Sequence, residues 1–88
     1  MSRADRMQAA LEASFAPSHL VIEDESARHH GHAGHREGGE THYRIEIESA
    51  VFAGRPRVAC HRLVTESLAA EFQSGLHALS LVTRAPSA

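Results

Sequence analysis

The sequence predicts an α+β fold of two layers, in which helices cover one face of a three-stranded sheet. Two observations lead to this class. Two segments carry apolar residues at the spacing of an amphipathic helix, and three shorter segments have the alternating or branched-residue pattern of a strand. Their order along the chain is α-β-β-α-β. Three strands with one apolar face need a cover, and two amphipathic helices can supply it.

The first helix is predicted over residues 3–15. Ser2 is a suitable N-cap, and Asp5 three residues later nearly completes a capping box. Pro17 stops the helix, because the residue before a proline is disfavoured in the helical conformation. The residues that lie largely off the apolar side are Arg3, Arg6, Gln8 and Glu12. The stripe expected to face the core consists of Met7, Ala10, Leu11, Ser14 and Phe15.

Two strands follow, separated by a long connection. The first, residues 19–24, is short and rich in branched side chains. The second, residues 42–48, alternates, with Tyr43, Ile45 and Ile47 directed toward a core and the polar residues between them toward water. This pattern predicts a sheet with one solvated face, in which the second strand is most easily antiparallel to the first.

The second helix is predicted to follow a turn at residues 52–56 and to end near residue 74. Pro56 can occupy its first turn, and Gly75 is expected in a left-handed conformation just after its end. Its apolar stripe repeats every four residues and should rest on the apolar face of the second strand. The members of this stripe are Val64, Leu68 and Phe72, with Leu63 adding width.

The last strand is predicted over residues 76–83, and a small polar tail begins near Pro86. The sequence has no internal repeat and no sign of a second unit, so residues 1–88 are expected to form a single domain that is monomeric alone. His77 would alternate onto the same face as Leu79. From its position alone, it is therefore expected to be a half-buried structural histidine bonded to a carbonyl group.

Composition and charge exclude several classes of function. The formal net charge of −2 gives no general attraction to nucleic acid or to an anionic membrane. The longest apolar runs are too short for a transmembrane span, and the first residues lack the apolar segment of a secretory signal. The single cysteine, Cys60, excludes an internal disulfide and fits a reducing compartment, so a cytoplasmic location is expected. Cys60 itself is expected to be a small helix residue rather than a ligand.

The connection between the first two strands, residues 25–41, is the most unusual stretch of the sequence. Four of the eight histidines fall within seven residues there, among four glycines and without apolar periodicity. A hairpin needs only about two loop residues, so this loop is long for some other reason. Neutral imidazole is the commonest protein metal ligand. A metal site, a solvated loop and an incidental metal-binding tract all remain open, and we expect the loop to be poorly ordered without a partner.

Several short motifs stand in order along nearly the whole chain: residues 24–26, His29, residues 39–43, residues 52–54, residues 61–64, Leu68, Glu71 and residues 77–79. Together, at these spacings and in this element order, they resemble the BolA-like proteins. The His-Ala-Gly-His loop at residues 32–35 is similar to the branch of the family that has a histidine in this loop. The resemblance implies a fold similar to class II KH domains.

The resemblance also implies a partner and a cofactor. The partner is a monothiol glutaredoxin of the Cys-Gly-Phe-Ser type, and a [2Fe-2S] cluster is bridged between the two proteins for iron–sulfur assembly or iron homeostasis. The glutaredoxin contributes its cysteine and a bound glutathione. The BolA-like protein contributes a histidine at the last strand and a loop residue, which match His77 and His29 here. His32 and His35 are possible substitutes for His29.

Ligand counting from the composition agrees with a shared cluster. A [2Fe-2S] cluster needs about four ligands, usually cysteines, and two histidines replace two of them in Rieske sites. A chain with one cysteine cannot build an ordinary cluster site alone, so any cluster must be shared with a thiol-bearing partner. Imidazole ligands can be protonated, so the iron they hold should be more labile and more dependent on pH.

The alternative hypothesis is a nucleic-acid-binding regulator, of stress response or cell morphology. Arg55, Arg57, His61 and Arg62 around the start of the second helix favour it, together with the KH-like fold. The negative net charge, the 5% of aromatic residues and the absence of a Gly-x-x-Gly loop weigh against it. Compared with the family, Cys60 replaces a usual basic residue and Thr65 a common tyrosine. An enzyme is least favoured, because the sequence has no nucleophile–base pair and no phosphate loop.

Overall fold

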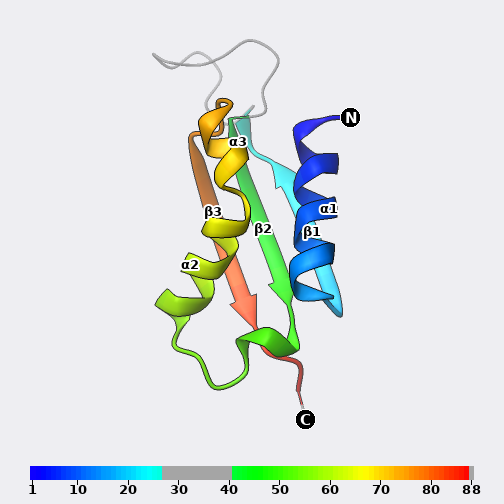
Figure 1. Ribbon diagram of the computed structural model, residues 1–88, viewed down its shortest axis with the longest axis vertical. Helices are drawn as coiled ribbons and strands as arrows, with labels where there is room; N and C mark the ends of the chain where they lie inside the picture. Colours follow the sequence, from blue (N-terminus) through cyan, green and yellow to red (C-terminus); the bar gives the residue numbers. More distant parts are fainter. Residues whose placement is uncertain (27–40, 88) are drawn as a thin grey trace.

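The computed structural model describes residues 1–26 and 41–87. The α+β class is confirmed, since the described strands form one three-stranded sheet with helices packed on one of its faces (Figure 1). The element bounds are α1 (Arg3–Phe15), β1 (His19–Asp24), β2 (His42–Glu48), the short 3-10 helix η2 (Ala50–Phe52), α2 (Arg57–Ser67), α3 (Ala69–Gln73) and β3 (Ala78–Arg84).

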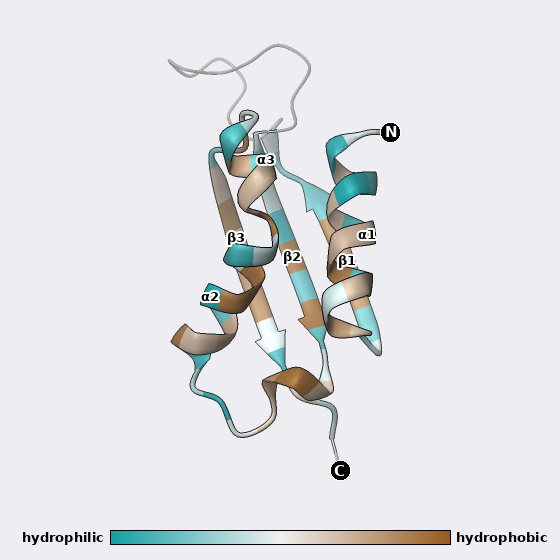
Figure 2. Ribbon diagram, in the orientation of Figure 1, coloured by the Kyte–Doolittle hydropathy of each residue, from teal (hydrophilic) through white to brown (hydrophobic). Residues whose placement is uncertain are grey.

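The central strand is β2, which pairs antiparallel with β1 and parallel with β3. The predicted antiparallel pair is confirmed, with Leu20 opposite Ile47 and Ile22 opposite Ile45. Figure 2 shows apolar and hydrophilic residues alternating along β2. The apolar side chains of this strand, those of Tyr43, Ile45 and Ile47, are buried in the core. The opposite face of the sheet carries the charged residues of β2, as the alternation predicts.

The sheet and the helices enclose a single core among the described residues. Its most deeply buried side chains come from α1, β2 and α2, with Phe15 and Phe52 in ring contact at 5.3 Å between centroids. Ser14, predicted on the core stripe of α1, is instead exposed, and Arg3, predicted off it, is only 9% exposed. The core consists of Met7, Leu11, Phe15, Tyr43, Ile45, Ile47, Phe52, Cys60, Val64, Leu68 and Leu76.

The second predicted helix is interrupted at Leu68, which separates α2 from α3. The Ser67 hydroxyl donates to the carbonyl oxygen of Val64 at 2.8 Å. This oxygen would accept the Leu68 N–H in a continuous helix, but the Leu68 N–H instead bonds to Thr65 O at 3.1 Å. A serine hydroxyl that competes for a backbone carbonyl thus accounts for the break. Leu68 nevertheless stays in the core, at 1% exposure.

The end of α3 follows the sequence prediction more closely. Gly75 has a positive φ of 126°, a backbone conformation that favours glycine. The N–H of Leu76 reaches back to the carbonyl oxygen of Glu71 at 2.9 Å, which is the long hydrogen bond of a Schellman motif. Leu76 thereby enters the core, at 3% exposure, before β3 begins at Ala78.

The sequence also predicts that no segment spans a membrane and that residues 25–41 form a long loop. None of the helices in the described ranges combines the length and apolar character needed to cross a membrane. The predicted loop at residues 25–41 falls mostly on residues 27–40, which lie outside the described residues. The two ends of this loop, residues 25–26 and residue 41, are described.

Candidate functional site

The two ends of the long loop are held together by the Ser26 side chain, which is 2% exposed. Its hydroxyl oxygen accepts the backbone N–H of Thr41 at 2.9 Å and that of His42 at 3.1 Å, and the Thr41 hydroxyl donates to it at 3.2 Å. Beside this hydroxyl, the Glu25 N–H donates to His42 O at 2.7 Å and the Ser26 N–H donates to Asp24 Oδ1 at 2.8 Å. The loop therefore leaves the sheet from a closed, hydrogen-bonded base.

The loop base is also hydrogen-bonded to His77, the residue that precedes β3. The carbonyl oxygen of Thr41 accepts the backbone N–H of His77 at 2.9 Å and that of Ala78 at 3.2 Å. Since Thr41 is also bonded to Ser26, one residue connects the loop base to the start of β3. The sequence shows short hydroxyl residues on both sides of the loop, but it does not show that they meet.

The His77 side chain lies exposed at this junction. Its ring is edge-on to that of His42, with 5.9 Å between the centroids and 68° between the planes. The Nδ1 atom of His42 lies 3.0 Å from the Thr41 hydroxyl oxygen, a hydrogen bond whose direction depends on the histidine tautomer. Two imidazoles thus lie side by side at the rim of the sheet, next to the loop base.

Two predictions about His77 are wrong. It was expected within the last strand and half-buried, but β3 begins one residue later and His77 is exposed. The physical reason is the turn after α3, in which Leu76 occupies the core position and leaves His77 at the rim. His42 is the first residue of β2, as the strand predicted over residues 42–48 implies.

The donor atoms at this rim are those of imidazoles. No group of three or more histidine, cysteine or acidic side chains that could hold a metal occurs in the described ranges. Cys60 lies elsewhere: it is 4% exposed, with its Sγ 3.9 Å from Phe52 O and 3.8 Å from Arg55 O. It lines a pocket with Thr83 and Arg84, at the end of β3 far from His77. This donor set fits the imidazole half of a mixed cluster site. The other predicted ligands, His29, His32 and His35, lie outside the described residues.

A buried ionic cluster fixes the segment that leads to His77. Arg3 donates to Glu71 Oε1 at 2.7 Å, to Glu71 O at 3.0 Å and to the Ser74 hydroxyl at 2.8 Å. Arg6 adds two hydrogen bonds of 3.0 Å to the same carboxylate. The hydrogen bonds from Arg6, and then the charges of Arg6 and Arg3, hold the pKa of Glu71 below its usual value. Sequence periodicity did not reveal this cluster, because it joins α1 to α3 through charged residues.

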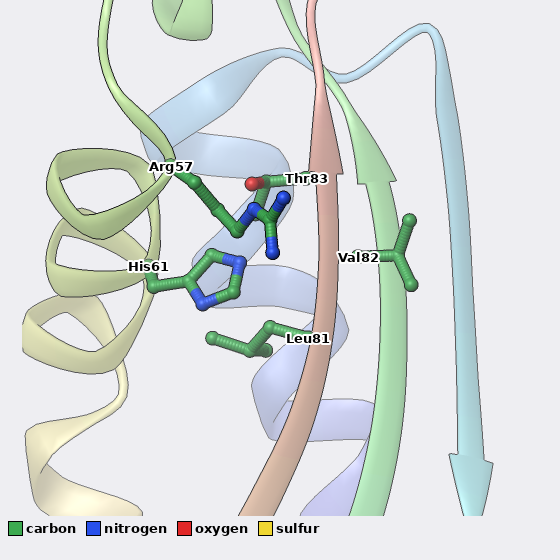
Figure 3. Close-up of a pocket in the computed structure, with 5 residues that line it drawn as sticks. All are labelled: Arg57, His61, Leu81, Val82 and Thr83. Carbon is green, nitrogen blue, oxygen red and sulfur yellow. The ribbon is translucent and has the colours of Figure 1, made fainter.

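The four residues of the nucleic-acid hypothesis lie around the start of α2. Arg57 and His61 lie one helical turn apart and line a pocket of about 320 Å³ with residues of β3 (Figure 3). Arg55 lines an adjoining pocket that also includes Arg57, and its Nε donates to Val51 O at 2.8 Å. Arg62 is exposed on α2 and lines neither of these two pockets. The structure therefore brings Arg57 and His61 together and separates Arg62 from them.

Comparison with known proteins matches this chain to one family. The family model for BolA-like proteins matches residues 11–88. The chain is 47% identical to the chloroplastic protein BOLA1 of Arabidopsis thaliana over 98% of its own length, and it spans 55% of the length of that relative. It is 35% identical to the DNA-binding transcriptional regulator BolA of Escherichia coli, covering 90% of this chain and 71% of the regulator.

A solved structure supports the same likeness. The BolA domain of SufE1 from Arabidopsis thaliana superposes with a TM-score of 0.87 at 43% sequence identity, covering 98% of this chain and 94% of that domain. The helices and the three-stranded sheet described above are thus those of a known BolA domain.

Proposed function

Because the chain belongs to the BolA-like family, we propose that it is a partner of a monothiol glutaredoxin of the Cys-Gly-Phe-Ser type and shares a [2Fe-2S] cluster with it. The cluster is cargo, held for transfer in iron–sulfur assembly or for sensing in iron homeostasis. The observation that carries the proposal is the exposed His77 imidazole, whose backbone is bonded to the base of the histidine-rich loop.

The ligands divide between the two proteins. His77 and a loop histidine, first choice His29, would hold one iron, and His32 or His35 could replace His29. The cysteine of the glutaredoxin and the thiol of its glutathione would hold the other iron. Bound there, the cluster supplies iron and sulfide that can be passed on. The described part of this chain offers imidazoles at the rim and keeps its single thiol buried elsewhere, which supports a division of this kind.

The two histidines have different roles in this proposal. His77 is held by the hydrogen bond of its backbone N–H to Thr41, so its position is set before a partner binds. A ligand on a preorganised backbone costs less ordering on binding than one on a free segment. His77 therefore provides the fixed ligand, and a loop histidine completes the site.

The test is anaerobic reconstitution of the cluster with a monothiol glutaredoxin and glutathione, followed by visible circular dichroism. We expect His77→Ala to abolish or strongly weaken the mixed cluster while the protein stays folded. His61→Ala is the matched control, because it removes an imidazole from α2 without touching the rim, and it should leave the spectrum unchanged. An unchanged spectrum and cluster lifetime for His77→Ala would contradict the proposal.

A second candidate function is nucleic-acid binding by a KH-like fold. It is favoured by the likeness to the Escherichia coli protein named as a DNA-binding transcriptional regulator. In this chain the contacts would come from Arg55, Arg57, His61 and Arg62. Titration of the free protein with a labelled duplex at several salt concentrations tests it, since phosphate contacts by these residues would give a steep dependence on salt. Binding that survives His77→Ala would separate this function from cluster binding.

A further inference from the structure

The pocket between α2 and β3 lies at an edge of the sheet, because among the described strands β3 pairs with β2 alone. It has a volume of about 320 Å³ and is lined by Arg57 and His61 from the helix and by Leu81, Val82 and Thr83 from the strand. Figure 3 shows Leu81 and Thr83 directed toward α2, whereas Val82 extends from the other side of β3. The pocket is at the opposite end of β3 from His77 and belongs to a different site.

The side chains that line this pocket include a guanidinium and an imidazole but no carboxylate. Arg57 is exposed, and the structure shows no hydrogen bond or ion pair of its guanidinium within the described ranges. Other arginines of this chain face carboxylates, as Arg3 faces Glu71 and Arg84 faces Glu48. No carboxylate lines the pocket beside Arg57 and His61. A guanidinium and an imidazole therefore face a cavity without a counter-charge.

The strand side of the pocket contains a hydroxyl group with no partner. Thr83 Oγ1 is buried and makes no hydrogen bond among the described residues. Thr83 lies opposite Ile47 on the face of the sheet that packs against the helices, where valine would match the surroundings without a polar atom. Buried hydroxyls are nearly always hydrogen-bonded, so an unpaired one calls for an explanation. Figure 3 shows the Thr83 oxygen beside the Arg57 side chain.

The start of α2 adds to the positive potential. Its N-cap, Pro56, offers no side-chain acceptor to the first turn, and this turn contains no acidic residue. The backbone N–H groups at a helix N-terminus carry a partial positive charge and favour an anion nearby. The pocket thus combines a guanidinium, an imidazole, a buried hydroxyl donor and the start of an eleven-residue helix.

We propose that this pocket binds a phosphate group, held by the Arg57 guanidinium, the His61 imidazole and the Thr83 hydroxyl. Donors that converge from a helix and a strand suit the several oxygens of a tetrahedral anion, and the Thr83 hydroxyl gains the acceptor it lacks. Leu81 supplies an apolar side to the pocket, so the phosphate is that of a monoester with a small organic group. Two sources offer this chemistry: a free phosphomonoester and the terminal phosphate of a nucleic acid.

The test is a titration of the isotope-labelled full chain with inorganic phosphate, and then with glycerol 3-phosphate, at constant ionic strength, followed by amide chemical shifts. We expect saturable shifts at Arg57, His61 and Thr83. Arg57→Gln should weaken binding about tenfold, which corresponds to about 1.4 kcal/mol. Arg44→Gln is the control, since it removes the same charge from the charged face of the sheet, outside the pocket, and it should change binding less than about twofold. Equal losses in the two variants, or shifts that do not saturate, would overturn the proposal.

The hydroxyl is tested separately with Thr83→Val, which keeps the shape and removes the polar atom. The variant should stay folded, and it should bind phosphate several-fold more weakly. Unchanged phosphate binding would remove Thr83 from the site and overturn the three-donor arrangement. The source is tested by competition with glycerol 3-phosphate at Arg57, using one oligonucleotide with and without a 5′-phosphate. Competition by the phosphorylated form alone would identify nucleic acid as the source. Failure of both oligonucleotides to compete would identify the free ester.

Discussion

The carbonyl oxygen of Thr41 accepts the backbone N–H of His77 at 2.9 Å, so the end of the long loop and the start of β3 are one hydrogen-bonded unit. Thr41 is also bonded to the buried Ser26 hydroxyl, which closes the loop base. The antiparallel pairing of β1 with β2 ends at Asp24 and Tyr43, and this unit extends the hydrogen bonding from there to the loop base. The unit keeps the two ends of the glycine-rich loop next to His77.

Ser26→Ala should destabilise the protein by about 2 kcal/mol, because it leaves the buried N–H groups of Thr41 and His42 without their acceptor. Urea unfolding measures the loss. Ser18→Ala is the matched control, since the Ser18 hydroxyl is exposed and bonds to the Glu48 carboxylate. It should cost less than about 0.5 kcal/mol. Equal effects of the two substitutions would show that the loop base does not depend on Ser26.

Leu68→Ala should lower the free energy of unfolding by about 2–4 kcal/mol, as expected when a core side chain that is 1% exposed is truncated. Although Leu68 interrupts the helix, its side chain still packs with Val64 and the apolar face of β2. Val58→Ala on α2 provides the comparison, because Val58 is 65% exposed and should change stability by less than about 0.5 kcal/mol. A loss below about 0.5 kcal/mol for Leu68→Ala would mean that the helix face is misassigned.

The stability of the protein should fall in acid partly through Glu71. Its pKa in the folded state lies below the usual value of 4.5, chiefly because of hydrogen bonds from Arg6 and the charges of Arg6 and Arg3. A depressed pKa means that the ionised carboxylate stabilises the fold above pH 4.5, and that this contribution is lost as the pH falls through the folded-state pKa. The unfolding free energy, measured between pH 7 and pH 3, should therefore decrease over the acid part of that range.

Glu71→Gln isolates this contribution. This substitution should lower the free energy of unfolding by about 3 kcal/mol at pH 7, because the buried Arg3 guanidinium loses its counter-charge. Its stability should also depend less on pH below 4.5 than that of the natural protein. Glu66→Gln on the exposed side of α2 should match the natural protein within about 0.5 kcal/mol. Parallel acid profiles for the natural protein and Glu71→Gln would show that another carboxylate dominates.

Among histidine substitutions, His29→Ala should shorten the lifetime of the shared cluster less than His77→Ala does. Neighbouring loop histidines, His30 or His32, can take the place of His29. No histidine adjoins His77 in the sequence, and the Nδ1 atom of His42 beside it is hydrogen-bonded to the Thr41 hydroxyl. The loss of visible absorbance after anaerobic dilution gives the lifetimes. The reverse order, with His29→Ala the more severe change, would mean that the loop supplies the fixed ligand.

Acidification should release the cluster from the heterodimer. Free histidine takes up a proton below about pH 6.5, and a protonated imidazole cannot bind iron. The visible spectrum should therefore be stable at pH 8 and lost below about pH 6. A glutaredoxin homodimer cluster, which has no histidine ligand from this chain, is the control. A mixed cluster as resistant to acid as this control would argue against imidazole ligation.

Local patterns in the sequence determined where the regular elements lie. Ser2, Asp5 and Pro17 mark both ends of α1, and Tyr43, Ile45 and Ile47 mark the buried face of β2. These signals act over a few residues, through capping, backbone restriction and alternation, so they can be read without the fold. The motifs that carry the family resemblance can also be identified from the sequence alone, and the proposed ligands His77 and His29 were assigned from them.

Tertiary structure alone decided the contacts between distant segments. The exposure of His77 depends on the buried Leu76 and on the hydrogen bond to Thr41, and the burial of Arg3 depends on Glu71 in α3. The unpaired hydroxyl of Thr83 likewise became visible only with its neighbours in place. Periodicity describes one element at a time, whereas burial and hydrogen bonding at these residues are set by which other element packs against them.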